Sequence, residues 1–344
     1  MNRIVLTEQE LGAIKALLGE LASQYKNVED ESFLKDACLY AHELPRRIRM
    51  FLNDFKALEL PTGICLISGY EIDDAKVGRT PGHWKFREGV SPALEEEILL
   101  ILYGSLLGEM VAWSTQQNGY IVHDVLPIKG HEHEQLGSSS EEVLTWHNED
   151  AFHPYRCDYL GMMSMRNPTN VATTVACVDS IELDEKQIEI LFQPRFTIRP
   201  DESHLEKNRS ALKKLEAMPD DKLSDAYQRI NQMNSSPEKL AVLFGSPQSP
   251  YIRVDPYFMD TLEDDPEAQS ALEALVKLID GRIADLVLER GDCVFMDNYR
   301  VVHGRKPFVA NYDGNDRWLK RISVTRDLRK SRSARASCTS RIIY

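Results

Sequence analysis

The sequence predicts a mainly β fold, a sandwich or jelly roll, with helical additions. Three observations support this prediction. Many short β-rich segments, separated by Gly, Pro, Asn or Asp, follow one another from about residue 119 onward. Before that region, apolar residues recur at helical spacing within residues 7–58 and 91–113. Helical patterns return at about 205–235 and 261–280, where they interrupt the β-rich region.

The first 113 residues are expected to be mostly helical and to pack on the β-rich core. The segment that starts at Thr7, TEQELGAIKALLGELASQY, opens with a capping residue and has its apolar residues at helical spacing. LPRRIRMFLNDFKAL is a second helical segment, and GICLISGYEI is a buried strand that ends in a glycine turn. Residues 91–113 form the strongest predicted helix, because they open with Ser-Pro, continue with three glutamates and then turn apolar.

Residues 114–328 are expected to form the β-rich core, with a helical insertion at about 203–280. The expected strands lie in GYIVHDVLPI, VLTWHNE, YLGMMSMRN, TTVACV, RFTIRP, LAVLFG, YIRVD, DCVFMDN, RVVHGR and KRISVTRDL. The tail, residues 329–344, is rich in Ser, Arg and Lys, and is either a solvated end or a strand that returns to the core. We expect residues 1–344 to form a single domain.

The composition argues against several classes of protein. The net charge of −13 argues against general nucleic-acid binding, which needs a basic surface, but it allows an acidic pocket for a small cationic molecule. The six cysteines are scattered without a CxxC pair, so we expect neither a disulfide scaffold nor a zinc ribbon. The N-terminus lacks the pattern of a signal peptide, and no apolar run reaches roughly 18 residues. We therefore expect a cytoplasmic protein without membrane or nucleic-acid partners, whose oligomeric state stays open.

The segment TWHNEDAFH, residues 145–153, is the first candidate site. His147 and Glu149 are separated by one residue, so on an extended segment their side chains project from the same face. A further histidine, His303, lies in the strand-like segment RVVHGR. Two histidines and one carboxylate are the ligands of the facial triad, which binds Fe(II) and leaves positions open for an organic acid and dioxygen. The alternative is a chance H-x-E pattern in a charged surface loop or at a helix start.

A cation for the organic acid is the second feature that such an oxygenase needs. Arg317 and Arg321 follow His303 in the segment NDRWLKRISVT. Arginine binds a carboxylate through two parallel hydrogen bonds because its guanidinium is planar. If RWLKRISV is a strand, the spacing of four places both side chains on one face. The alternative is that both arginines are surface charges.

Several longer segments are similar to those of a known family. HNEDAFHPYRCDYLGMMSMRNP, VVHGRKPF, DRWLKRISV and QQNGYIVHDVLPIKG resemble the clavaminate-synthase-like Fe(II)/2-oxoglutarate-dependent oxygenases. The resemblance is closest to the arginine and capreomycidine β-hydroxylases, and it runs from about residue 113 to about residue 325. The set of HxE, His and Arg is common to a large superfamily, whereas the segment around HNEDAFHP together with HDVLPI is more specific.

The resemblance implies a double-stranded β-helix, or jelly-roll, core and a set of site residues. The implied iron ligands are His147, Glu149 and His303. Dioxygen and 2-oxoglutarate are the implied cosubstrates. Arg321 is then the main anchor of the distal 2-oxoglutarate carboxylate, with Arg317 beside it. A supporting hydroxyl is implied at Thr174, with Thr173 as the near alternative.

The resemblance also implies hydroxylation of a free basic amino acid at C3 in antibiotic biosynthesis, with release of succinate and CO2. The residues implied for the amino-acid head group are Gln117, Leu136, Ser138 and Glu149. Related arginine enzymes present a D-x-D pair to the guanidinium; here Asp255 matches the first acid and Tyr257 stands at the second. One buried carboxylate still favours a cationic side chain. Arginine or a related guanidino amino acid is therefore favoured, and lysine and ornithine stay open.

Other functions stay open at this point. Desaturation uses the same residues as hydroxylation. A non-catalytic jelly-roll binding protein would have a degenerate metal site, and a zinc hydrolase would need a poised general base. The HEHE segment, residues 131–134, lacks the HExxH spacing that places two imidazoles on one helix face, so we interpret it as a lid loop. We interpret His123 as a core residue, and Asp150 and His153 as residues behind the site.

Overall fold

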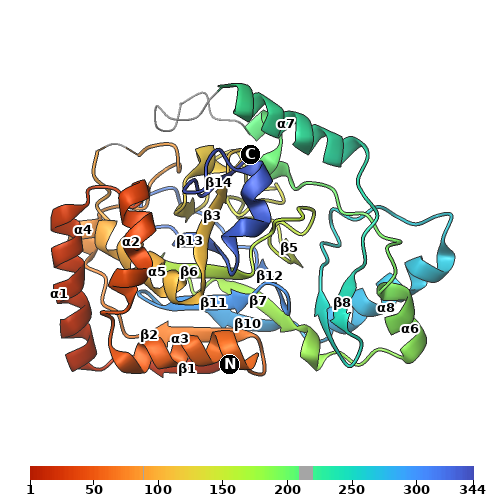
Figure 1. The fold of residues 1–344 in the computed structure, drawn as a ribbon, viewed down its shortest axis with the longest axis horizontal. Coiled ribbons are helices and arrows are strands. Elements are labelled where there is room, and N and C mark those ends of the chain that lie inside the picture. Colours follow the sequence, from red (N-terminus) through yellow and green to blue (C-terminus); the bar gives the residue numbers. More distant parts are fainter. Residues whose placement is uncertain (88, 209–219) are drawn as a thin grey trace.

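The computed structural model describes residues 1–87, 89–208 and 220–344 (Figure 1). Within these ranges the larger sheet is eight-stranded, in the order β1–β2–β11–β6–β13–β3–β14, with β4 paired to β13. Its strands are β1 (Asn2–Val5), β2 (Ile64–Ser68), β3 (Glu109–Trp113), β4 (His123–Val125), β6 (Tyr159–Arg166), β11 (Cys293–Asp297), β13 (Trp318–Thr325) and β14 (Ile342–Ile343). The central pairs are antiparallel, while β1–β2 and β14–β3 are parallel.

A smaller sheet packs against the larger one. In the described part of the chain it has the order β10–β7–β12–β5. Its strands are β5 (Leu144–His147), β7 (Ala172–Cys177), β10 (Ala284–Val287) and β12 (Val301–Arg305). Apolar side chains of β2, β6, β11 and β13 meet those of β7, β10 and β12 in one core, so the two sheets lie face to face. A separate hairpin pairs β8 (Leu243–Ser246) with β9 (Ser249–Ile252).

The helices of the N-terminal part cover one side of the larger sheet, where Figure 1 shows them in red and orange. They are α1 (Glu8–Gln24), α2 (Glu31–Ala41), α3 (Arg46–Leu58), α4 (Asp74–Val77) and α5 (Leu94–Leu107). α1 begins after Thr7, whose hydroxyl accepts from the backbone N–H of Glu10 while the Glu10 carboxylate accepts from the N–H of Thr7. α5 is buried along nearly its whole length because it packs against α2 on one side and β13 on the other.

The segment 91–113 is shorter as a helix than its sequence predicts. Helix α5 ends at Leu107, and the segment EMVAW forms strand β3. A Cβ atom at Gly108 would lie 2.2 Å from the carbonyl oxygen of Thr325, so only glycine lets the chain pass this close to the end of β13. Pairing of β3 with β13 therefore overrides the helical pattern of this segment.

Most strands expected in the β-rich region are present, which confirms a fold of mainly sheet with helices. YLGMMSMRN, DCVFMDN and RVVHGR contain β6, β11 and β12, and TTVACV covers β7 except its first residue. Each of the other expected segments but one contains or overlaps a strand. RFTIRP is the exception, because Phe196 and Ile198 make only single bridges, to Leu240 and Met259. Strands β1 and β10 were not expected. The tail returns to the core as β14, the second of its two predicted alternatives.

Three α-helices lie within the described part of the β-rich region. They are α6 (Glu185–Leu191), α7 (Asp220–Ser235) and α8 (Pro266–Asp280). α7 and α8 match predicted segments, whereas α6 was not expected. The helix predicted for LEKNRSALKKLEAM, residues 205–218, lies mostly outside the described residues. None of the described helices combines the length and the apolar composition that crossing a membrane requires.

Candidate functional site

The two predicted histidine ligands lie opposite each other on neighbouring strands. β5 and β12 pair antiparallel, and His147 at the end of β5 is directly opposite His303 on β12. Their ring centroids are 4.7 Å apart. Directly opposite residues of an antiparallel pair have their side chains on the same face of the sheet. The strand register therefore brings together two residues that are far apart in the sequence.

Glu149 completes the triad from the turn that follows β5. Its Oε2 atom lies 3.4 Å from Nε2 of His303 and 4.0 Å from Nε2 of His147. Ligand atoms at such separations can share one ion at bond lengths of about 2.1 Å. Nδ1 of His147 is 2.8 Å from the carbonyl oxygen of Thr145, which can only accept, so Nδ1 carries the proton and Nε2 is free to bind a metal. The three side chains therefore fit a metal ion with open positions.

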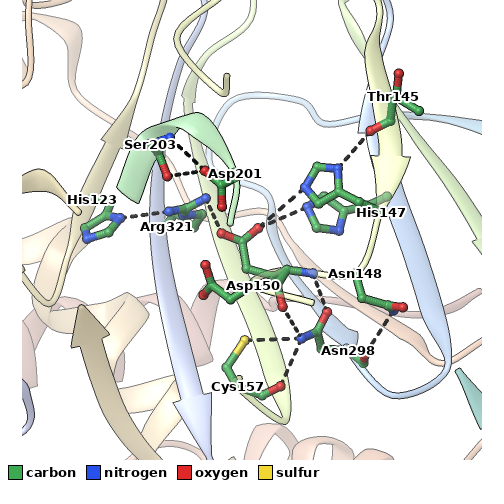
Figure 2. A network of polar contacts seen from close by, with 12 residues as sticks. His123, Thr145, His147, Asn148, Asp150, Cys157, Asp201, Ser203, Asn298 and Arg321 are labelled. Carbon is green, nitrogen blue, oxygen red and sulfur yellow. Dashed lines mark hydrogen bonds and ion pairs between the residues drawn. The ribbon is translucent and has the colours of Figure 1, made fainter. Parts of the chain in front are cut away.

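Two buried asparagines hold the turn that carries these ligands (Figure 2). The Asn148 amide donates to the carbonyls of Asn298 and Val301 at 3.0 and 2.9 Å, and its Oδ1 accepts from the N–H of Val254. Asn298 accepts from the N–H of Glu149 at 2.8 Å and donates to its carbonyl at 3.0 Å. Each bond satisfies a buried backbone group, so the pair fixes the backbone on both sides of the metal ligand. Neither asparagine was predicted as a site residue.

Arg321 lies beside the triad, and its charge is balanced by Glu149. Its Nη1 is 2.5 Å from Oε1 of Glu149, and its Nη2 lies 2.9 Å from Nδ1 of His123, as Figure 2 shows. The same Nη2 also lies 3.0 Å from Oε1 of Gln116. Burial alone would raise the pKa of Glu149, but the charge of Arg321 and the contact with His303 lower it below its usual value. Glu149 is therefore held as a carboxylate, the form that binds a metal.

Arg317 is a buried cation with no carboxylate partner in the described part of the chain. Its side chain donates through Nη2 to the hydroxyl of Thr173 at 3.2 Å, while its Nε has no hydrogen-bond partner there. Burial, and then the nearby charge of Arg305, lower the pKa of Arg317 to about 9. An anion bound next to this guanidinium would offset the free-energy cost of burying its charge. Arg317 therefore has the properties of a carboxylate anchor.

The hydroxyl beside Arg317 belongs to Thr173, the alternative, and not to Thr174, the first expectation. Successive side chains of a strand point to opposite faces, so only one of the two can face the cavity. Thr173 lines the cavity, whereas Thr174 points toward the backbone of Gly304, where an added Cβ would lie 2.8 Å from its hydroxyl. The sequence order alone does not tell which of two adjacent threonines faces inward.

The triad opens into a cavity of about 280 Å³. Arg317 and Thr173 line it together with the apolar side chains of Met162 and Leu319. The cavity wall also contains the remaining predicted site residues: Gln117, Leu136, Ser138, Asp255, Tyr257 and Arg321. Residues from both sheets and from several loops thus meet around one space beside the candidate metal position.

Asp255 is the cavity residue that was expected to meet a cationic substrate. It lies shortly after β9 and its side chain is buried. Burial raises the pKa of Asp255 to about 6, although His147, when its imidazole is protonated, opposes this rise. Tyr257 is 56% exposed and so meets the cavity at its rim. A cation next to Asp255 would favour its charged form.

Gln117, expected at the substrate head group, is fixed by its own loop. Its Nε2 donates to the carbonyl of Asp124 at 2.8 Å, and its Oε1 accepts from the N–H of the same residue at 3.1 Å. Its neighbour Gln116 is the glutamine that contacts Arg321. Gln117 therefore shapes the wall of the cavity, while Gln116 reaches the charged centre.

Leu136 and Ser138 follow shortly after the HEHE segment, residues 131–134, which was interpreted as a lid loop. The carbonyl of Leu136 accepts from the N–H and the hydroxyl of Ser139, at 3.0 and 2.7 Å. The hydroxyl of Ser138 is 2.9 Å from Nδ1 of His131, the first histidine of HEHE. Both residues line the cavity. The HEHE segment thus supports this wall of the cavity and does not join the triad.

Asp201 and Ser203 also line the cavity, and neither was predicted. Asp201 caps the short 3₁₀ helix Glu202–His204, and its carboxylate accepts from the N–H of Ser203 at 2.8 Å and from the Ser203 hydroxyl. The Gln116 amide donates to that hydroxyl at 2.7 Å, which ties this segment to the charged centre. The only signal in the sequence is an Asp-x-Ser capping pattern, which also occurs in ordinary surface turns.

Asp150, Asp201 and His204 form a second group whose ligand atoms lie within 4.8 Å of one another. Asp150 accepts from Nε1 of Trp113 at 2.5 Å, and its other oxygen is 3.0 Å from Nε2 of His204. Nδ1 of His204 is 2.8 Å from the hydroxyl of Thr115. These contacts use both nitrogens of His204 and both oxygens of Asp150. The group is therefore a hydrogen-bonded support behind the triad, as expected for Asp150, and not a second metal site.

Comparisons with known proteins agree with this geometry. The model of the taurine catabolism dioxygenase TauD, TfdA family matches residues 191–323. The chain is 44% identical to an enduracididine β-hydroxylase of Streptomyces hygroscopicus and 41% identical to an L-ornithine/L-arginine 3-hydroxylase of Catenulispora acidiphila, with 100% of each chain covered. It superposes with a TM-score of 0.93, at 43% identity and 100% coverage of both chains, on the crystal structure of the non-heme iron oxygenase OrfP in complex with Fe, succinate and (3S)-hydroxy-L-Arg.

Identity above 40% over complete chains, together with this superposition, extends the likeness well beyond the matched family segment. The three candidate metal ligands, the buried Arg317 that has no acid partner in the described part of the chain, and the shared cavity are the parts that an iron enzyme with an organic-acid cosubstrate requires. On these grounds the chain belongs to the TauD/TfdA family of Fe(II)- and 2-oxoglutarate-dependent oxygenases, in its clavaminate-synthase-like group.

Proposed function

We propose that this oxygenase hydroxylates a free basic L-amino acid at C3, with arginine or a related guanidino amino acid favoured. The observation that carries the proposal is the buried carboxylate of Asp255, which lines the same cavity as the three metal ligands. A buried carboxylate needs a cation as its partner, and the side chain of a basic amino acid supplies one. The relatives named for enduracididine and for ornithine and arginine support the same substrate class.

The triad is proposed to hold Fe(II) through His147, Glu149 and His303. Bound there, Fe(II) with 2-oxoglutarate and dioxygen supplies the oxidation, in which one oxygen atom enters a C–H bond of the substrate and the other enters succinate as CO2 leaves. The chain itself binds and orients the reactants. Asn148 and Asn298 keep the turn with Glu149 rigid, so the position of the reacting C–H bond is set by fixed groups.

Arg317 is proposed to bind the distal carboxylate of 2-oxoglutarate, with the hydroxyl of Thr173 beside it. Arg317 is favoured because its charge has no acid partner in the described part of the chain and because it faces the cavity. Arg321, the anchor that the resemblance implied, is already paired with Glu149. We therefore assign Arg321 mainly to the positioning of Glu149.

The amino acid is proposed to lie across the cavity, with its head group near Leu136, Ser138 and Glu149. Its cationic end then meets Asp255, and Asp201 supplies a second carboxylate from a different segment. Two carboxylates from separate segments can take the place of a D-x-D pair for a guanidinium. This arrangement supports the binding of a substrate with a guanidino group, even though Tyr257 occupies the position of the second acid in the D-x-D pair.

We also propose that the two facing sheets form a double-stranded β-helix and that residues 1–344 form one domain. One apolar core supports this proposal, because it joins residues of the N-terminal helices to Met163, Phe295 and Ile322 of the larger sheet. A cytoplasmic location is proposed as well. The free thiols of Cys65 and Cys157, which are buried, are consistent with a reducing compartment.

The test is incubation of the purified protein with Fe(II), 2-oxoglutarate and air in the presence of single amino acids. L-arginine, L-enduracididine, L-ornithine, L-lysine and neutral L-glutamine form the panel. Mass spectrometry should show the gain of one oxygen atom in a guanidino substrate, with one succinate formed for each product. Loss of two hydrogen atoms would indicate desaturation. Preference for L-glutamine, or no succinate with any basic amino acid, would contradict the proposal.

A further inference from the structure

Arg305, at the end of β12, holds the segment 136–142 against the site. Its guanidinium donates to the carbonyl and the hydroxyl of Ser139, and to the carbonyl of Glu142 at 2.6 Å. The backbone N–H of Phe308, just after β12, donates to the carbonyl of Ser140 at 2.8 Å. Ser139 in turn donates through its N–H and its hydroxyl to the carbonyl of Leu136. The segment that carries Leu136 and Ser138 is therefore attached to one buried arginine.

The same arginine lies beside the proposed 2-oxoglutarate anchor. Arg305 is directly opposite Thr173 in the pairing of β12 with β7, and Thr173 accepts from Arg317. Both arginines line the cavity and both are buried. Neither has a carboxylate within ion-pair distance among the residues that the structure describes. Two buried positive charges thus face one side of the cavity and are not balanced by any described carboxylate.

This arrangement has an energetic consequence. Buried cations without a counter-ion repel each other and are costly, so an anion bound at Arg317 stabilises both guanidinium groups. A better stabilised Arg305 should make stronger hydrogen bonds to Ser139 and Glu142, because these bonds depend on a planar, charged guanidinium in a fixed position. Stronger attachment of the segment 136–142 in turn favours the binding of a ligand that contacts Leu136 and Ser138.

We propose that Arg305 is a positioning residue that couples the binding of 2-oxoglutarate to the order of the segment 136–142, and through it to the binding of the amino acid. The inference rests on the proposed function, since it takes 2-oxoglutarate as the anion and this segment as a wall of the amino-acid site. By linkage, each ligand then strengthens the binding of the other.

Arg335 provides a matched control. It is also buried, and its guanidinium donates to the carbonyls of Leu328, Ser337, Cys338 and Ser340 with no acid partner in the described part of the chain. It does not line the cavity. An arginine that only holds a loop together should therefore behave like Arg335, whereas a coupling residue should not.

The experiment measures L-arginine affinity by anaerobic calorimetry on Fe(II)-loaded protein, with and without saturating 2-oxoglutarate. Hydrogen exchange of the segment 136–142 is followed in parallel. In the wild type, 2-oxoglutarate should strengthen arginine binding by about five-fold or more and slow exchange in the segment. Arg305→Lys keeps the charge but loses the planar fork, so 2-oxoglutarate affinity should stay within about three-fold while the coupling falls below about two-fold.

Two further variants complete the experiment. Arg305→Gln removes the charge, so it should weaken 2-oxoglutarate binding and also lose the coupling, whereas Arg335→Lys should keep both. Coupling that survives in Arg305→Lys, or that is lost equally in Arg335→Lys, would overturn the inference. A wild type that binds both ligands with no coupling and no change in exchange would overturn it without any variant. A wild type that binds neither 2-oxoglutarate nor L-arginine would instead refute the proposed function, and this inference with it.

Discussion

Arg321 donates to Glu149 across 2.5 Å, and it contacts the carboxylate oxygen that does not face the two histidines. The Glu149 carboxylate thus contacts Arg321 through Oε1 and faces the candidate metal position through Oε2. Arg317, four residues earlier, faces the same cavity but has no such partner in the described part of the chain. Two arginines that look equivalent in the sequence are therefore different in their electrostatic state.

This difference predicts that Arg317, more than Arg321, determines the affinity for 2-oxoglutarate. Arg317→Ala should raise the Kd for 2-oxoglutarate by about 10- to 150-fold, since a charge-assisted pair contributes about 1.5–3 kcal/mol. Arg321→Ala should weaken iron binding more than 2-oxoglutarate binding, because it releases Glu149. Anaerobic titrations of both variants with Fe(II) and then with 2-oxoglutarate measure the two effects separately.

Thermal unfolding of the metal-free proteins is the control for Arg317→Ala. That variant should remain folded, because removing a cation with no acid partner leaves no buried carboxylate unpaired. If Arg321→Ala impairs 2-oxoglutarate binding more than Arg317→Ala does, the assignment of the two arginines has to be exchanged.

Asp255 should determine the preference for a basic substrate. Asp255→Asn should lower kcat/KM for L-arginine by a factor that corresponds to about 2–5 kcal/mol of transition-state stabilisation, because the substrate cation would lose the buried one of its two carboxylate partners. The measurement is succinate formation at increasing L-arginine concentration. Asp260→Asn, which alters a partly exposed carboxylate paired with Arg199, should have little effect and serves as the matched control.

Tyr257 gives a second check on the same prediction. Its side chain is 56% exposed, so Tyr257→Phe should change kcat/KM for L-arginine only slightly. Tyr257→Asp should raise the preference for arginine over lysine, because a carboxylate there completes a D-x-D pair with Asp255 and adds to the carboxylate of Asp201 around the guanidinium. Full activity of Asp255→Asn toward L-arginine would show that Asp255 is only a turn residue.

Asn298 should support both the fold and the metal. Asn298→Ala leaves the backbone N–H and carbonyl of Glu149 without their partner, at about 1–3 kcal/mol of stability for each buried group. Misplacement of Glu149 should also weaken iron binding by about 10- to 100-fold. Urea unfolding and an anaerobic Fe(II) titration measure the two effects.

The matched control for Asn298 is Asn167. Its side chain also bonds backbone groups, those of Val171 and Leu288, but it does not line the cavity. Asn167→Ala should therefore lower stability without changing iron affinity. Equal loss of iron affinity in both variants would mean that Asn298 acts only through global stability.

The sequence could point to the three candidate metal ligands because their residue types and spacing form short patterns. The H-x-E pair lies at the end of one strand and the second histidine lies on another. Pairing of β5 with β12 is enough to bring them together, because its register places His147 opposite His303. Local signals also predicted α1, since its capping residue Thr7 and its apolar spacing agree. In these cases local pattern and tertiary structure favour the same result.

The features that escaped prediction depend on tertiary contacts. Asn148 and Asn298 look like ordinary loop residues until the fold buries them against backbone groups. The end of α5 is set by the close approach of Gly108 to Thr325 and not by the local sequence. The partners of Arg317 and Arg321 depend on side-chain geometry around Glu149, so the sequence could place both near the site but could not assign the roles.

A buried charge cluster on the other face of β13 should control acid stability. Nζ of Lys320 is 2.6 Å from Asp124 and 2.7 Å from Glu97. Burial alone would raise the pKa of Asp124, but the charges of Lys320 and Arg87 lower it to about 2. The unfolded value is about 3.9. This carboxylate therefore stabilises the fold fully above about pH 4, and the contribution, about 2 kcal/mol, is lost as the pH falls toward about 2.

Asp124→Asn tests this prediction. The variant should be less stable than the wild type at pH 7, and the difference in the free energy of unfolding should close between about pH 4 and about pH 2. Urea unfolding at a series of pH values measures the difference. A gap that stays constant over this range would show that Asp124 contributes through shape and hydrogen bonding and not through its charge.

The most direct test of the central claim is an anomalous diffraction map of crystals grown without oxygen and soaked with Fe(II) and 2-oxoglutarate. We expect one iron peak bounded by Nε2 of His147, Oε2 of Glu149 and Nε2 of His303, with the distal carboxylate of 2-oxoglutarate at Arg317 and Thr173. An iron peak at Asp150, Asp201 and His204, or a protein that binds 2-oxoglutarate with no iron at the triad, would contradict it.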